Sequence, residues 1–258
     1  MKSAIFITVR SNSKRLPNKA LIKIQSIPTI VHLIRRVKNV NVDHIILCTT
    51  LLKEDDILCD IATSEGIDFF RGSTLDKLDR WKGASSKFNI DFFVTADGDD
   101  LFCSTELIEL ALNQYINNKP DFIESPDAIC GSFTYGIKVK ALNKVCDIKN
   151  SDDTEMMWTY FKDTEIFEVE VLKNVPVEFI RSDIRMTLDY CDDLMFFEKI
   201  INHFYDNKNI NFSIRDIILY LNHNPEVIKI NSYLHDEWKK NQEANTHLDL
   251  KKRNNALL

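Results

Sequence analysis

The first 118 residues alternate short apolar segments with helical patterns, and this alternation limits the possible folds. Apolar runs predict strands at residues 4–9, 44–48, 67–70 and 89–95. Helical spacing predicts helices at residues 30–37, 54–64 and 105–116, and a capping-box pattern at Ser73 and Asp76 predicts another that ends near 88. Strands that alternate with helices connect by right-handed crossovers into a parallel sheet. We therefore expect an α/β fold with helices on both faces of the sheet.

The second half of the chain shows a different pattern, with fewer helices between the apolar runs. Strands are predicted at residues 122–123, 133–139, 167–171 and 185–188, and helices at 191–204 and 213–221. We expect a mixed sheet here and one domain at 1–235, divided into halves 1–118 and 119–235. The polar chain at 236–258 is expected to be a mobile tail.

Composition narrows the class of protein. The chain has 258 residues, 44% hydrophobic and 28% charged, which suits one large α/β domain. A net charge of -6 argues against a general nucleic-acid or anionic-membrane binder. We find no signal peptide and no apolar run near the roughly 18 residues that cross a bilayer. Six scattered cysteines without a Cys-x-x-Cys pair fit a reduced, cytoplasmic protein.

A loop rich in cations follows the first predicted strand. Its positive residues are Arg10, Lys14, Arg15 and Lys19. Ser11 and Ser13 are small enough for backbone amides to approach phosphate oxygens, and loops after buried strands lie where α/β folds bind ligands. We interpret the loop as a binding site for a polyanion. The alternative is a solvated basic loop with no ligand.

The fourth predicted strand ends in a crowded group of carboxylates. Asp97, Asp99 and Asp100 lie around Gly98 directly after buried residues. Like charges so close repel each other unless a cation lies among them, so a divalent metal is the simplest explanation. We expect Asp99 to be the metal ligand, with Asp97 as the second candidate. The alternative is an ordinary turn, because Asp-Gly pairs are common in turns.

The cationic loop resembles a known signature. Its pattern Arg-x-x-Ser-x-Arg-Leu-Pro-x-Lys is similar to that of cytidylyltransferases that make CMP-activated sugar acids, such as CMP-Kdo synthetase, acylneuraminate cytidylyltransferase and SpsF-like proteins. The matching positions are Arg10, Ser13, Arg15, Leu16, Pro17 and Lys19. Two departures occur: Asn18 replaces a usual Gly, and Ser26-Ile27-Pro28 replaces a Gly-Lys-Pro turn. Neither departure removes a charge.

Two further segments extend the resemblance. The segment at 70–81 is similar to a family box that lines the base pocket, which implies that Arg71 and Ser73 contact cytosine. Arg80 lies four residues after Asp76, and we interpret it as part of a helix-surface ion pair. The segment at 185–194 is similar to an Arg-x-Thr-x-Asp-x-x-x-Asp-Leu box, which implies that Asp189 is the second metal ligand. A helix cap is an equally good reading of Asp189.

The resemblance implies a Rossmann-like nucleotidyltransferase sandwich of the GT-A-like type and transfer of CMP from CTP to a sugar acid. Arg10, Arg15 and Lys19 would act on the triphosphate, and Asp99 and Asp189 would hold Mg²⁺. The resemblance further implies a homodimer. Two alternatives are a glycosyltransferase that uses Asp97 and Asp99 on a nucleotide-sugar, and a non-catalytic nucleotide-binding protein. Walker and dinucleotide motifs are absent, which argues against kinases and dehydrogenases.

Overall fold

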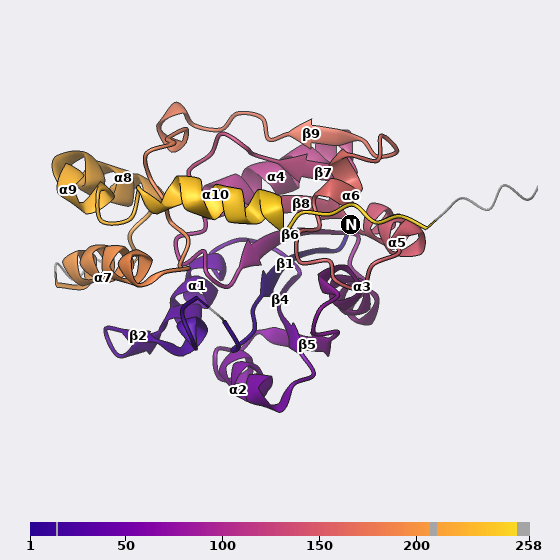
Figure 1. The fold of residues 1–258 in the computed structure, drawn as a ribbon, viewed down its shortest axis with the longest axis horizontal. Helices are drawn as coiled ribbons and strands as arrows, with labels where there is room; N and C mark the ends of the chain where they lie inside the picture. The colour runs from indigo at the N-terminus through magenta and orange to yellow at the C-terminus, as the bar shows by residue number, and fades with distance from the viewer. Residues whose placement is uncertain (14, 207–210, 252–258) are drawn as a thin grey trace, which may run out of the picture.

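A seven-stranded sheet, in the order β5-β4-β1-β6-β8-β7-β9, forms the centre of the protein (Figure 1). The structure is a computed structural model that describes residues 1–13, 15–206 and 211–251, so Lys14 of the cationic loop lies outside the described residues. The strands are β1 (Ser3–Thr8), β4 (His44–Thr50), β5 (Asp68–Gly72), β6 (Phe92–Asp97), β7 (Phe122–Glu124), β8 (Tyr135–Lys138) and β9 (Val169–Val171). A separate hairpin joins β2 (Lys23–Ile24) and β3 (Ile27–Pro28).

The sheet is mixed and mostly parallel, as the sequence predicted. β5, β4, β1 and β6 run parallel, β8 is antiparallel to β6 and β7, and β9 is parallel to β7. In the register of β1 and β6, Thr8 lies opposite Asp97. The loops that follow these two strands therefore leave the same edge of the sheet next to each other.

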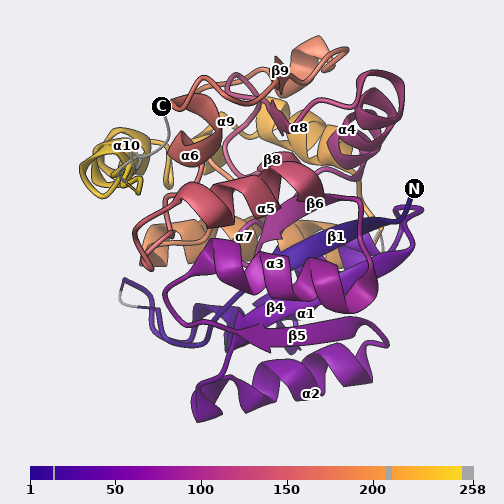
Figure 2. The same cartoon turned by 90° about the vertical axis from the view of Figure 1, so that its right-hand side faces the viewer.

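Helices cover both faces of the sheet, and Figure 2 shows α3 and α5 together on one face. The α-helices are α1 (Thr29–Val37), α2 (Asp56–Ser64), α3 (Lys77–Phe88), α4 (Thr105–Asn118), α5 (Val139–Ile148), α6 (Thr159–Lys162), α7 (Cys191–Asp206), α8 (Ile214–His223), α9 (Pro225–Ile228) and α10 (Leu234–Ala244). Short 3₁₀ turns are η1 (Lys19–Leu21), η2 (Lys53–Asp55) and η3 (Val177–Phe179). No helix of the described residues is long and apolar enough to cross a membrane.

Alternating residues of β1 explain why this strand is central. Ala4, Ile5, Phe6 and Ile7 are all fully buried. Ile5 and Ile7 pack in the core that includes α1 and α4, whereas Ala4 and Phe6 pack in the core that includes α3 and α5. A strand that is buried on both faces is apolar along its whole length, which is the pattern that the sequence shows.

The predicted strand at 185–188 is wrong. Arg185 makes only an isolated bridge with Cys130. The Met186 amide donates to the Cys130 carbonyl at 2.8 Å, and the Leu188 amide donates to the Asp99 carbonyl at 2.9 Å. The apolar residues of the segment are buried as expected, but their backbone partners belong to loops. A hydrophobic pattern reports burial and does not identify the hydrogen-bond partner.

Two further expectations differ from the structure. α3 begins at Lys77, because the Asp76 side chain accepts from the Asp79 amide at 3.0 Å and caps the helix in place of Ser73. The chain beyond 236 is not a mobile tail throughout, because α10 occupies Leu234–Ala244. α10 runs towards α5 (Figure 1), and the Lys251 amide then donates to the Ile148 carbonyl at 2.9 Å.

Gly131 provides a test of how the segment at 185–189 is placed. Its φ is +83°, and an added Cβ would lie 2.1 Å from the Met186 carbonyl oxygen. Gly66 has a similar φ of +68° but open space around it. We expect Gly66→Ala to lose about 1 kcal/mol of unfolding free energy from the left-handed backbone alone. Gly131→Ala should lose at least about 2 kcal/mol more, because backbone must move.

Urea denaturation of both variants measures this difference. Equal losses in the two variants would contradict the close approach of the two backbones at Gly131.

Candidate active site

Three chain segments meet at the carboxyl edge of the sheet. These are the loop after β1, the turn that begins at Asp97, the last residue of β6, and the segment at 185–189 before α7. The hydrogen bond from the Leu188 amide to the Asp99 carbonyl joins the second segment to the third. Backbone contacts therefore bring Asp99 and Asp189 to the same place, although 90 residues separate them in the chain.

Lys19 lies between these two carboxylates. Its Nζ is 2.7 Å from Asp99 Oδ2 and 2.9 Å from Asp189 Oδ1. Burial lowers the pKa of Lys19, but the two carboxylates outweigh burial and raise it above its usual value. Lys19 begins the 3₁₀ turn η1, and Asn18 before it has a left-handed φ of 55°. Asparagine tolerates this conformation, which fits its place where the resembling family has glycine.

Asp189 is the most strongly paired carboxylate of the site. Its side chain is 3% exposed, and its Oδ1 also accepts from Arg15 at 2.6 Å. Burial alone would raise its pKa, but Lys19 and Arg15 overcome this effect and hold the pKa below its usual range. Arg185 donates to the other oxygen, Oδ2, at 3.3 Å. Asp189 is therefore an ionised carboxylate among three cations.

Asp97 and Asp100 do not share the Lys19 cation. Lys77 Nζ lies 3.2 Å from Asp97 Oδ1, and Asp100 accepts from the Thr134 hydroxyl at 3.4 Å. Burial raises the pKa of both carboxyls, and neighbouring carboxylates raise that of Asp100 further. Within residues 1–13, 15–206 and 211–251, no group of three or more His, Cys, Asp or Glu side chains is arranged to hold a metal.

A pair of carboxylates still fits Mg²⁺ chemically. Mg²⁺ is usually bound by one or two protein carboxylates together with water and substrate phosphates, and it needs no cage of protein ligands. Asp99 and Asp189 both reach one ammonium ion, so one small cation can contact both side chains. The Asp99 side chain is 24% exposed, which leaves an approach from solvent. The donor set therefore fits Mg²⁺ only when a phosphate completes it.

Asp55, a residue that our sequence analysis did not single out, holds the start of the cationic loop. This fully buried carboxylate accepts from the Ser11 amide at 2.8 Å and the Ser11 hydroxyl at 2.6 Å. Its other oxygen accepts from the amide and the hydroxyl of Thr50. Both donors of Ser11 are thus used within the protein. The sequence did contain a signal for this role, because Asp55 is an acidic residue at the start of a predicted helix, shortly after the end of a predicted strand.

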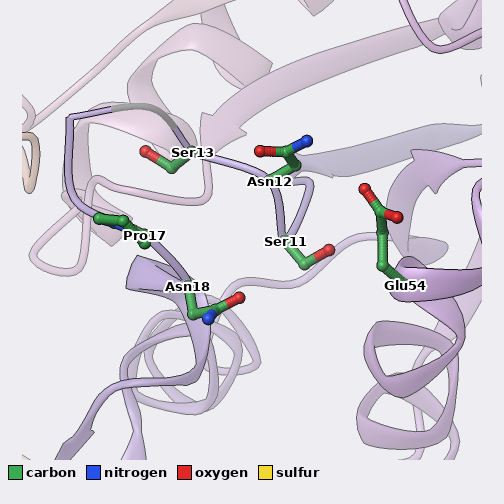
Figure 3. A pocket seen from close by; sticks show the side chains of 6 residues that line it. All are labelled: Ser11, Asn12, Ser13, Pro17, Asn18 and Glu54. Atoms are coloured by element: carbon green, nitrogen blue, oxygen red, sulfur yellow. The ribbon is translucent and has the colours of Figure 1, made fainter.

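A pocket of about 230 Å³ lies against the loop. Figure 3 shows its lining: Ser11, Asn12, Ser13, Pro17, Asn18 and Glu54. Glu54 belongs to η2, on the opposite side of the pocket from Pro17. The loop therefore curves around a small polar space, although the Ser13 amide itself donates to the Ser11 carbonyl at 3.0 Å.

The predicted base-binding residues have internal partners. Arg71 donates to the carbonyls of Thr50 and Leu52 at 2.9 and 2.7 Å, and to Asp56 at 2.6 Å. These bonds tie β5 to the turn after β4. The Ser73 hydroxyl accepts from the Asp76 amide at 3.1 Å.

The interpretation of Arg80 as a surface ion pair with Asp76 is wrong. Arg80 is 3% exposed and donates to the Ser73 carbonyl at 2.6 Å, while Asp76 pairs with Lys149. The helical spacing of four residues was correct, but the Asp76 side chain caps the helix and faces a lysine from the second half of the chain.

Arg10 and Glu155 complete the charged surface around the loop. Arg10 lies 3.7 Å from Glu155, a residue that the sequence did not single out. Burial would raise the pKa of Glu155, but Lys77 and Arg10 lower it below its usual value. Basic groups of the first half, Arg10, Lys19 and Lys77, therefore meet an acidic residue of the second half beside the loop.

Comparison with known proteins identifies the family. A model of the family described as cytidylyltransferase matches residues 4–223. The chain belongs to this family. The sequence prediction of a cytidylyltransferase with a nucleotidyltransferase fold is thereby confirmed, and the chain is a nucleotidyltransferase.

Relatives cover nearly the whole chain. An uncharacterized protein of Methanocaldococcus jannaschii is 33% identical, over 90% of this chain and 95% of that protein. The spore coat polysaccharide biosynthesis protein SpsF of Bacillus subtilis is 22% identical, over 88% of this chain and 97% of that protein.

Solved structures share the fold of this cytidylyltransferase. A cytidylyltransferase from Leptospira borgpetersenii has a TM-score of 0.80 at 24% identity, over 88% of this chain and 97% of that one. CMP-2-keto-3-deoxy-manno-octonic acid synthetase, solved with CTP, has a TM-score of 0.60 at 14% identity, over 79% of this chain and 99% of that one.

Asp55→Asn tests the support of the loop. We expect it to cost about 3 kcal/mol of unfolding free energy at neutral pH, because four buried donors lose a charged acceptor. Burial raises the pKa of Asp55, but the Ser11 and Thr50 donors lower it more, so the folded pKa is depressed. Its contribution is therefore present above the unfolded pKa and is lost as pH falls through the folded pKa.

Asp56→Asn is the matched control, because this half-exposed carboxylate makes one ion pair with Arg71. It should cost less than about 1 kcal/mol. Denaturant unfolding between neutral and acid pH measures both variants. Equal losses at neutral pH, or a loss in Asp55→Asn that does not shrink in acid, would contradict the role of Asp55.

Proposed function

We propose that this cytidylyltransferase transfers CMP from CTP to a sugar acid and releases diphosphate. The observation that carries the proposal is the position of Lys19 between Asp99 and Asp189, at the end of a loop with further cations. A lysine ammonium has three donors, and the two carboxylates use two of them. The third is available for a phosphate oxygen beside the proposed metal pair.

In this proposal the charged residues form two groups with different roles. Arg10, Arg15 and Lys19 neutralise the triphosphate and the leaving diphosphate, and Ser13 lines the loop that encloses it. Asp99 and Asp189 hold Mg²⁺, which when bound would neutralise phosphate charge and help to orient the α-phosphate. Arg71 supports the turn after β4 and Ser73 supports the turn after β5, and these turns border the cytosine base.

The chemistry is a single displacement. The acceptor hydroxyl attacks the α-phosphorus, its proton passes to solvent, and the bond from the α-phosphorus to the bridging oxygen breaks as diphosphate leaves. The protein contributes mainly alignment and charge neutralisation, so no covalent intermediate is required. We place the nucleotide in the half at 1–118 and the acceptor in the half at 119–235.

The sugar acid, a role in surface polysaccharide synthesis, a homodimer and a cytoplasmic location are further parts of the proposal. Similarity to the spore coat polysaccharide biosynthesis protein SpsF and to CMP-2-keto-3-deoxy-manno-octonic acid synthetase supports the first two. The alternative of a glycosyltransferase that uses Asp97 and Asp99 on one ion has less support. Asp97 contacts Lys77 while Asp99 contacts Lys19, so the two side chains have separate cationic partners.

A diphosphate-release assay tests the proposal. The protein is incubated with each of CTP, UTP, ATP and GTP and a panel of 2-keto-3-deoxy and related sugar acids, with Mg²⁺ or with a chelator. We expect release only with CTP, a sugar acid and Mg²⁺ together, because base, acceptor and charge neutralisation are all needed. Release with a purine nucleotide, or undiminished release with the chelator, would overturn the assignment.

A further inference from the structure

Asn231 is a fully buried polar residue in the turn between α9 and α10. The family model ends at residue 223, so this turn and α10 lie beyond the matched region. Burying an amide costs free energy unless it is hydrogen-bonded, and buried side-chain amides almost always have partners. The partners of Asn231 therefore indicate what the C-terminal segment contributes.

Asn231 is linked to Asp189 through one carboxylate. Its Nδ2 donates to Asp193 Oδ1 at 2.9 Å and to the Arg185 carbonyl at 3.1 Å. Asp193 lies in the first turn of α7 and is fully buried. Its Oδ2 accepts from the amides of Asp189 and Tyr190, at 2.9 and 3.0 Å. The carboxylate that Asn231 orients thus holds the backbone of the proposed metal ligand.

A second link runs through the guanidinium of Arg185. Nε donates to Asp193 Oδ1 at 2.9 Å, and Nη2 donates to Asp189 Oδ2 at 3.3 Å. The ring of Trp238, from α10, lies 5.2 Å from this guanidinium, which is 1% exposed. Arg185, which contacts Trp238 of the C-terminal helix, therefore holds Asp189 Oδ2 in place, while Oδ1 faces Lys19.

We propose that Asn231 is a positioning residue that sets the orientation of the Asp189 carboxylate towards the divalent ion. The C-terminal segment at 225–244 then acts on the active site through Asp193 and Arg185. The inference rests on the proposed function. Carboxylate ligands are commonly held by hydrogen-bonded neighbours, and loss of such a neighbour typically weakens metal binding by about 10- to 100-fold.

Asn231→Leu tests this role because it keeps the size of the side chain and removes the donor. The readout is the affinity for CTP, measured by calorimetry with full-length protein, once with Mn²⁺ and once with a chelator. We expect affinity without metal to stay within about twofold of wild type, because the loop cations are untouched. The gain in affinity on adding Mn²⁺ should fall by about 10- to 100-fold.

Asn224→Leu, at the residue directly before this segment, is the matched control. Its Nδ2 donates to the Tyr220 carbonyl at 2.8 Å and has no link to Asp189. If Asn231→Leu does not fold, Asn231→Ser replaces it in the test. Because serine keeps one donor, we expect a smaller fall in the gain of CTP affinity on adding Mn²⁺. The inference is overturned if the folded Asn231 variants gain as much CTP affinity from Mn²⁺ as wild type does. It is also overturned if Asn224→Leu loses as much of this gain as the Asn231 variants. Wild-type protein that gains nothing from Mn²⁺ would overturn the proposed function as well.

Discussion

The ion pairs of Lys19 are the interactions on which the arrangement of the site depends. One ammonium joins the loop after β1 to the turn after β6 and to the segment before α7. Buried charges are costly unless they are paired, so the buried Asp189 carboxylate depends on its cations, whereas the more exposed Asp99 depends less on Lys19. In the proposed function, an incoming phosphate and metal ion would meet charges that the fold has already brought together.

Much of the fold could be predicted from the sequence because its information is local. The apolar run of β1 and the alternation with helices up to α4 were read correctly, since periodicity reports burial directly. The segment at 185–188 was misread because burial alone does not reveal that its backbone bonds to loops. α10 was missed because its polar sequence is held by a contact of Trp238 with Arg185, which lies more than 50 residues away in the chain.

The sequence was enough to predict which residues form the site, but not which side chains pair with each other. The residues Arg15, Lys19, Asp99 and Asp189 were singled out in sequence, and the structure brings their side chains together. The crowding of aspartates after β6 suggested mutual repulsion around one ion. Instead Asp97 and Asp99 have different lysines, because successive side chains in a turn point in different directions. Asp55 and Asn231 act through other residues, so no motif marks them.

The most direct test compares Asp189→Asn with Asp99→Asn in diphosphate release and unfolding free energy. Both variants should lose more than about 100-fold in turnover, since each removes one of the two carboxylates proposed to hold the metal. Asp189→Asn should also lose about 3 kcal/mol of stability, because it leaves buried cations unpaired, whereas the more exposed Asp99→Asn should lose about 1 kcal/mol or less. Near-normal turnover in either variant, or an Asp189→Asn protein as stable as wild type, would contradict the account.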